Sequence, residues 1–95
     1  MPTVLRHRVS GEIACGMLKN VYDFAYYGAL RWDDNEKAEE ESASALALAG
    51  YEDDSGWDAL EVGEERLKLF NVKLNNDRGR RLLLQSDGTI AVIRS

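Results

Sequence analysis

The chain has 95 residues, with 12 basic and 17 acidic side chains, a formal net charge of −5 and one cysteine. This length suits a single domain over residues 1–95 and leaves no room for a second independent core. The hydrophobic content of 44% is too high for a disordered acidic tail. Cys15 cannot form an internal disulfide, and no apolar stretch approaches the roughly 20 residues of a membrane-spanning helix. We therefore expect a soluble cytoplasmic protein that does not bind membranes.

Charge is unevenly distributed along the chain. Residues 32–65 contain thirteen acids and one base, Lys37, for a net charge of −12, whereas the segments before and after carry +2 and +5. The acidic segment is either a solvated helix face and loop, or a face that attracts a basic partner over about a Debye length. Nucleic acid is not expected to bind this face directly, because phosphate repels carboxylate. At the basic end, Arg78, Arg80 and Arg81 form either a solvated turn or a contact for phosphate.

The first third of the sequence predicts a strand followed by a helix. Side chains alternate over residues 3–9, and the arginines there are typical of an edge strand. Ser10 is a candidate N-cap for a helix over 11–30, although two glycines in that range weaken it. Its apolar positions recur at helical spacing: Ile13, Met17, Val21 and Phe24. The aromatic residues near its end are core residues or interface anchors: Tyr22, Tyr26, Tyr27 and Trp32.

A second helix is predicted with clear start and stop signals. It begins at Asp33-Asp34-Asn35-Glu36, where an aspartate can cap the first turn, and it ends before Gly50. Its buried stripe consists of small residues at helical spacing: Ala38, Ser42, Ala45 and Ala49. The consecutive glutamates at 39–41 repel one another, so they must face water or a basic partner.

The rest of the chain predicts strands and turns. Residues 57–62 are interpreted as a strand, with a helical start at 55–58 as the alternative. Residues 66–74 predict a second strand, with a bulge where the alternation slips between Leu69 and Phe70. Residues 75–79 have turn composition. We therefore expect an α+β fold: an N-terminal strand, two α-helices, then a three- or four-stranded antiparallel β-meander ending in a hairpin.

The final hairpin is predicted from Asp87-Gly88 between two apolar runs, as a two-residue turn. That turn sets Leu84 opposite Ala91 and Leu82 opposite Ile93. Apolar pairs lie on both faces, so the hairpin is either covered on both sides or leaves one face for a partner.

Enzyme, metal and cofactor chemistry find little support in the sequence. The one histidine, His7, lies in the predicted first strand, where a packed side chain is expected, and Cys15 is expected to pack as a small hydrophobe. An EF-hand match at 53–56 fails, because Tyr51 and Val62 would fill the first and twelfth ligand positions. We therefore expect no enzyme activity, no cofactor and no metal.

The sequence instead favours a protein-binding inhibitor that docks an acidic surface on a basic, nucleic-acid-handling protein or ribonucleoprotein complex, as a nucleic-acid mimic would. The candidate contacts are Glu36, Glu39, Glu40, Glu41, Glu52, Asp53 and Asp54, with Tyr27 and Trp32 as apolar anchors. In size and charge the chain is similar to anti-CRISPR, antirestriction and nuclease-immunity proteins. A phage-type anti-CRISPR or antirestriction protein that blocks nucleic-acid binding is therefore the leading hypothesis.

Two alternatives remain open. One is a self-associating structural or accessory protein, a homodimer formed through the two-faced C-terminal hairpin. The other is a small ligand-binding domain or enzyme with a carboxylate pocket, which requires a concave site that the sequence cannot reveal.

Overall fold

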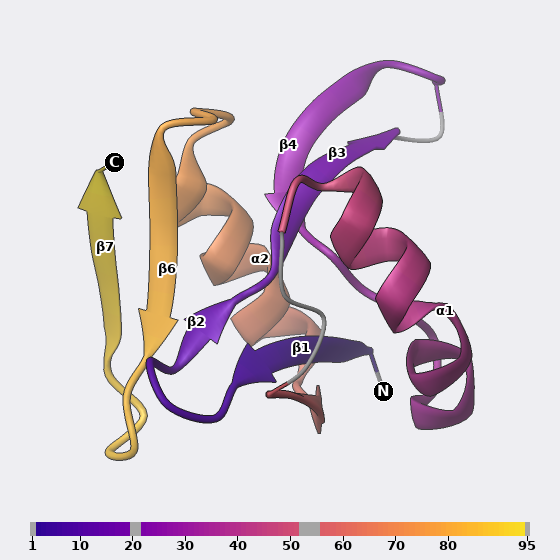
Figure 1. Cartoon of the computed structure of the whole chain (residues 1–95). Helices are drawn as coiled ribbons and strands as arrows, with labels where there is room; N and C mark the ends of the chain where they lie inside the picture. Colours follow the sequence, from indigo (N-terminus) through magenta and orange to yellow (C-terminus); the bar gives the residue numbers. More distant parts are fainter. Residues whose placement is uncertain (1, 20–21, 52–55, 95) are drawn as a thin grey trace.

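The computed structural model describes residues 2–19, 22–51 and 56–94, and the strands and helices below are those of this described part. In chain order the elements are β1 Thr3–His7, β2 Glu12–Ile13, β3 Cys15–Lys19, β4 Ala25–Ala29, α1 Asn35–Leu48, β5 Trp57–Glu61, α2 Glu64–Leu74, β6 Arg80–Leu84 and β7 Ile90–Arg94. Five strands form a sheet in the order β5-β1-β2-β6-β7, and β3 pairs with β4 as a separate ribbon (Figure 1). All of these pairings are antiparallel.

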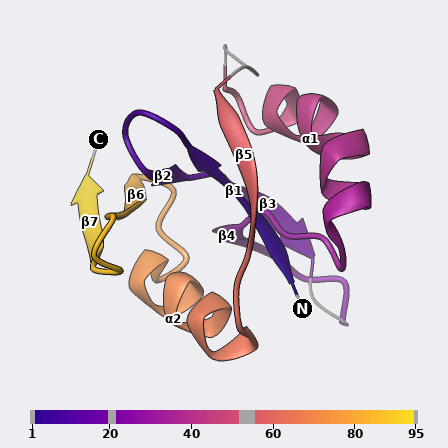
Figure 2. The ribbon, with the colours of Figure 1, turned by 90° about the horizontal axis from the view of Figure 1, so that it is seen from below.

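Strand β1 is buried on both faces. Val4 and Leu5 are 0% and 2% exposed, and neighbouring residues of a strand point to opposite faces. Val4 belongs to a core cluster with Phe70 of α2, whereas Leu5 belongs to a second cluster with Leu46 of α1. Figure 2 shows the same arrangement, with α1 and α2 on opposite sides of the β1–β5 pair. The N-terminal strand is therefore not the solvated edge that its arginines suggested.

Helix α1 confirms the sequence prediction. Asp34 is its N-cap, and the Asp34 carboxylate accepts a hydrogen bond from the Lys37 N–H at 2.8 Å. The helix ends at the cap residue Ala49, and Gly50 follows with a φ of 92°, which favours glycine. Ala38 of the predicted stripe is buried, and Leu46 beside it anchors the helix in the second cluster.

The helix predicted over residues 11–30 is wrong, because this segment forms β2, β3 and β4. Ser10 does not cap a helix; its hydroxyl accepts a hydrogen bond from the Glu12 N–H at 3.1 Å within a turn. Of the supposed helical face, Met17 and Phe24 are exposed, and Val21 lies outside the described residues. Backbone pairing with distant segments replaces helical hydrogen bonds, as where the Ala14 N–H donates to the Leu5 carbonyl at 3.0 Å.

Helix α2 holds the β3–β4 ribbon through side-chain amides. The Asn71 side-chain oxygen accepts a hydrogen bond from the Ala29 N–H at 3.0 Å, and the Asn76 oxygen accepts one from the Tyr27 N–H at 2.7 Å. Between these two, Gly28 allows the close approach, because a Cβ there would lie 2.8 Å from the Asn71 oxygen. The outer edge of β4 is therefore bonded to α2 and to Asn76 just beyond its C-cap, instead of to another strand.

The strand predicted over residues 66–74 is also wrong, because these residues belong to α2. Leu67, Phe70 and Leu74 are its buried positions, with the three- and four-residue spacing of one helix face. The slip between Leu69 and Phe70 was therefore the helical period and not a bulge. The turn predicted after it is confirmed, since Asn75 caps α2 in the left-handed conformation with a φ of 51°.

The C-terminal hairpin is confirmed, but its predicted register is wrong by one residue. Leu82 lies opposite Val92, and Leu84 lies opposite Ile90. The Gln85 N–H donates to the Thr89 carbonyl at 2.9 Å, so the loop has three residues, with Gly88 at a φ of 89°. The α+β class is thus confirmed, whereas the predicted order is not: β1–β4 precede α1, and α2 interrupts the predicted meander.

Leu46 and Leu48 of α1 test this packing as a matched pair. Leu46 is fully buried, whereas Leu48 is 89% exposed. Leu46→Ala is expected to lower the free energy of unfolding by about 2–5 kcal/mol, because it empties part of the second cluster. Leu48→Ala should change it by less than about 0.5 kcal/mol. Urea denaturation followed by circular dichroism measures both, and equal effects would contradict the orientation of α1.

Candidate functional site

The glutamates of α1 lie on its solvent side. Glu36, Glu39, Glu40 and Glu41 are all exposed, and only Ala38 and Leu46 of this helix are buried. At about 100° of rotation per residue, Glu36 and Glu40 point directly away from the buried stripe. Glu39 and Glu41 lie on opposite flanks of that line. The four carboxylates therefore spread over the exposed surface of the first half of α1, and we call this surface the acidic face.

The other predicted contacts do not extend this face. Glu52, Asp53 and Asp54 lie outside the described residues. Trp32 is half-buried against the second core cluster, and its backbone exchanges hydrogen bonds of 2.8 and 2.9 Å with Thr3. Tyr27 is half-buried on β4, where it packs against the first cluster. Both rings therefore belong largely to the interior of the fold.

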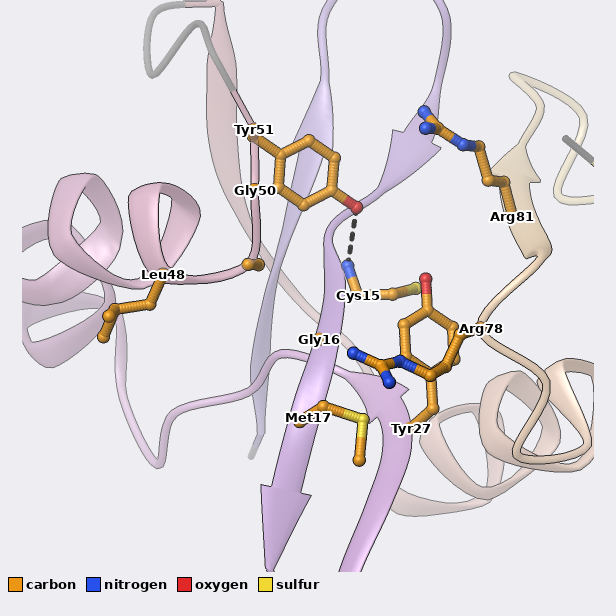
Figure 3. Close-up of a pocket in the computed structure, with 10 residues that line it drawn as sticks. Cys15, Gly16, Met17, Tyr27, Leu48, Gly50, Tyr51, Arg78 and Arg81 are labelled. Carbon is orange, nitrogen blue, oxygen red and sulfur yellow. Dashed lines mark hydrogen bonds between the residues drawn. The ribbon is translucent and has the colours of Figure 1, made fainter.

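A pocket of about 280 Å³ lies between β3, β4, the start of β6 and the end of α1. Its polar lining includes the side chains of Tyr27, Tyr51, Arg78 and Arg81. Figure 3 shows the two arginine side chains on either side of Cys15, with Arg78 reaching toward Gly16 of β3 and Arg81 extending away from Arg78. Helix α1 covers β1 and β5, so the pocket occupies the neighbouring space that this helix leaves open.

The three arginines that the sequence grouped together have different environments. The Arg80 guanidinium is half-buried, lies 3.5 Å from the Asp77 carboxylate and donates to the Lys73 carbonyl at 3.1 Å. Arg78 is exposed and pairs with none of the described carboxylates. Arg81 lies 3.4 Å from Glu12. Arg80 is therefore part of the scaffold, whereas Arg78 and Arg81 line the pocket.

Two tyrosine hydroxyls face the pocket in protonated form. The Tyr51 hydroxyl accepts a hydrogen bond from the Cys15 N–H at 2.9 Å. Burial is the main cause that holds the pKa of Tyr51 well above its usual range, although the hydrogen bond from Cys15 acts to lower it. Burial is also the main cause that raises the pKa of Tyr27 to about 12. At neutral pH both hydroxyls are therefore protonated, and that of Tyr27 donates to the Arg80 carbonyl at 3.4 Å.

Neither Cys15 nor His7 is arranged for nucleophilic catalysis. The Cys15 thiol donates to the Ile13 carbonyl at 3.2 Å, and burial, reinforced by the charge of Glu12, raises its pKa to about 12. Thiolate, the reactive form, is therefore scarce at neutral pH. The His7 ring packs edge-on against Trp57 with centroids 5.1 Å apart, and its Nδ1 accepts a hydrogen bond from the Val9 N–H. His7 thus supports a turn.

The described residues contain neither a metal-binding cluster nor a membrane-spanning helix. Within 2–19, 22–51 and 56–94, no three histidine, cysteine or acidic side chains group closely enough to hold a metal ion. In the same ranges, no helix has the length and apolar character needed to cross a bilayer.

Comparison with known proteins adds no relative. No family model matches the chain, and neither the curated proteins nor the solved structures contain a match.

The buried thiol predicts a loss of stability at alkaline pH. In the unfolded chain the Cys15 thiol ionises near its ordinary pKa of 9.0, but in the folded chain it does so only near 12. The contribution of the protonated thiol to the free energy of unfolding is complete below pH 9. It is lost as pH rises toward 12, by up to about 1.4 kcal/mol per pH unit. Denaturation curves from about pH 8 to about pH 10.5 measure the slope. Cys15→Ala should flatten it, and an unchanged slope would contradict the assignment.

Proposed function

We propose that this protein is a non-catalytic binding protein that docks the acidic face of α1 on a basic surface of a nucleic-acid-handling protein or ribonucleoprotein complex. The observation that carries the proposal is the exposure of Glu36, Glu39, Glu40 and Glu41 on one helix with only two buried side chains. Since α1 needs so little of its surface for folding, most of it remains accessible to a partner.

The chemistry of the acidic face favours a basic protein as the partner. Lys37 is the one base within α1, so it offsets only one of the four negative charges. Such a field attracts a Lys/Arg-rich surface and speeds encounter, with an effect that falls as salt rises. Beyond the glutamates, the exposed positions Ala43 and Ala47 carry small side chains. A partner surface can therefore approach the helix closely.

Within this class, we favour a small inhibitor of the anti-CRISPR or antirestriction type. The targets of such inhibitors use basic surfaces to bind phosphate backbones. The carboxylates of the acidic face can occupy such a surface as a nucleic-acid mimic. The short chain, its acidic charge and the protonated state of the buried thiol fit an inhibitor better than an enzyme. The partner would lose nucleic-acid binding when the protein docks.

Charge reversal at one exposed glutamate tests the docking surface. Tagged wild-type protein is used to capture its partner from nuclease-treated lysate of its native host, over a series of salt concentrations. Glu40→Lys should weaken capture about tenfold and reduce its salt dependence, because it removes an attraction and adds a repulsion. The matched control is Glu65→Lys, an exposed glutamate on α2, which packs on the opposite side of the β1–β5 pair (Figure 2).

Two results would contradict the proposal. One is equal loss of capture with Glu40→Lys and Glu65→Lys, which would indicate a general charge effect. The other is a captured partner that handles no nucleic acid. Thermal unfolding of both variants shows that each is folded before the comparison is made.

A second candidate function is self-association through β7. This strand is an edge of the five-stranded sheet, and Val92 and Ile93 on it are 39% and 43% exposed. An exposed edge can pair with the same edge of a second copy. The observation supports a homodimer that extends the sheet across both chains.

The mass of the protein in solution tests whether β7 pairs with a second copy. If β7 pairs with a second copy, sedimentation equilibrium gives an average mass that rises with concentration toward that of a dimer. Ile93→Lys should return the average mass to that of the monomer, because edge lysines oppose strand pairing. Val72→Lys is the control, since Val72 is 71% exposed on α2. A monomer mass for the wild-type protein at high concentration would contradict this candidate.

A further inference from the structure

The pocket beside the end of α1 has an unusual concentration of hydrogen-bond donors. Arg78 and Arg81 contribute guanidinium groups and Tyr51 contributes a hydroxyl, whereas the Tyr27 hydroxyl already donates to the Arg80 carbonyl at 3.4 Å. None of the described residues that line the pocket is acidic. The Tyr51 oxygen already accepts the Cys15 N–H, and no described acceptor takes the Tyr51 O–H. This hydroxyl therefore has a proton to donate.

From this geometry we propose that the pocket binds the phosphate group of a small molecule, with Arg78 and Arg81 as its cationic contacts and Tyr51 as a neutral donor. Guanidinium groups bind phosphate oxygens through paired, charge-assisted hydrogen bonds. Donors that come from several elements suit a tetrahedral group, whose oxygens point in several directions. This site is separate from the acidic face and does not depend on it.

The negative charges around the pocket limit its ligand. Glu12 lies 3.4 Å from Arg81, so it offsets one of the two positive charges. The end of α1 presents carbonyl groups, but those of Ala45, Leu46 and Ala47 already accept backbone N–H groups of residues 49–51. The remaining net charge near +1 favours one phosphate group over a highly charged ligand.

The size and rim of the pocket favour a small organic phosphate. A volume of about 280 Å³ lies just below the range of about 300–1,000 Å³ for pockets that hold drug-sized ligands, so the ligand must be small. Met17 lines it beside Tyr27 and is exposed (Figure 3). It can contact the organic part of a phosphate monoester, whereas an extended nucleic acid meets a molecule with a net charge of −5.

Three probes test the site in the full chain by two-dimensional NMR: inorganic phosphate, phenyl phosphate and a short single-stranded oligonucleotide. We expect saturable shifts of the Cys15, Gly16 and Tyr51 amides with both small phosphates, and tighter binding of phenyl phosphate. Arg78→Gln should weaken binding about tenfold or more, because it removes charge-assisted hydrogen bonds. Arg78 is exposed and bonds to no other described residue, so folding should not depend on it.

Lys68→Gln is the matched control, because Lys68 is exposed on α2 and its replacement removes the same charge. Affinity for both phosphates should be unchanged in this variant. The proposal is overturned if the wild-type protein shows no saturable shift at the pocket amides, or if Arg78→Gln and Lys68→Gln have equal effects. Binding of the oligonucleotide alone, dependent on Arg78, would also overturn it in favour of a nucleic-acid contact.

Discussion

The burial of β1 on both faces is the constraint on which the remaining structure depends. Val4 faces the core under α2 and Leu5 faces the core under α1, so one short strand joins two hydrophobic clusters. Thr3 adds two backbone hydrogen bonds to Trp32, and its hydroxyl donates to the Asn35 side chain at 3.0 Å at the first turn of α1. The acidic face is therefore held at a fixed orientation to the sheet. The pocket lies at the other end of the same helix.

The two proposed sites carry charges of opposite sign and lie on different parts of the molecule. The acidic face lies on α1, and the arginines of the pocket come from β6 and the turn before it (Figure 1). Among the described residues, the ion pairs do not join the two sites: Arg81 pairs with Glu12, and Arg8 pairs with Asp58 at 2.9 Å. A partner drawn to one site is repelled by the other, so a basic protein and a phosphate need not compete.

Sequence reasoning succeeded where local signals decide the structure. Asp34, the acids after it and Gly50 predict α1, because caps and helix dipoles act within one turn. It failed for β3–β4, where distant partners decide: Asn71 and Asn76 bond the edge of β4, and Gly28 makes room for one of them. It also failed for α2, because the helical spacing of its buried residues was interpreted as a strand with a bulge. The glutamates of the acidic face were predicted because they adjoin in sequence. The pocket was not, since Tyr51 meets Cys15 only across 36 positions.

The pairing of β2 with β6 also governs how the chain can fold. The Arg6 side chain donates to the Leu84 carbonyl at 3.0 Å across 78 positions, and a Cβ on Gly11 would lie 2.6 Å from the same carbonyl oxygen. Closing loops of this length costs entropy before any contact is gained, so such topologies fold slowly. On the ribosome, β1 and β2 emerge first and can pair with each other, but their outer partners β5 and β6 are synthesised much later. The nascent chain must therefore keep Val4, Leu5 and Ile13 from aggregating for nearly the whole of translation.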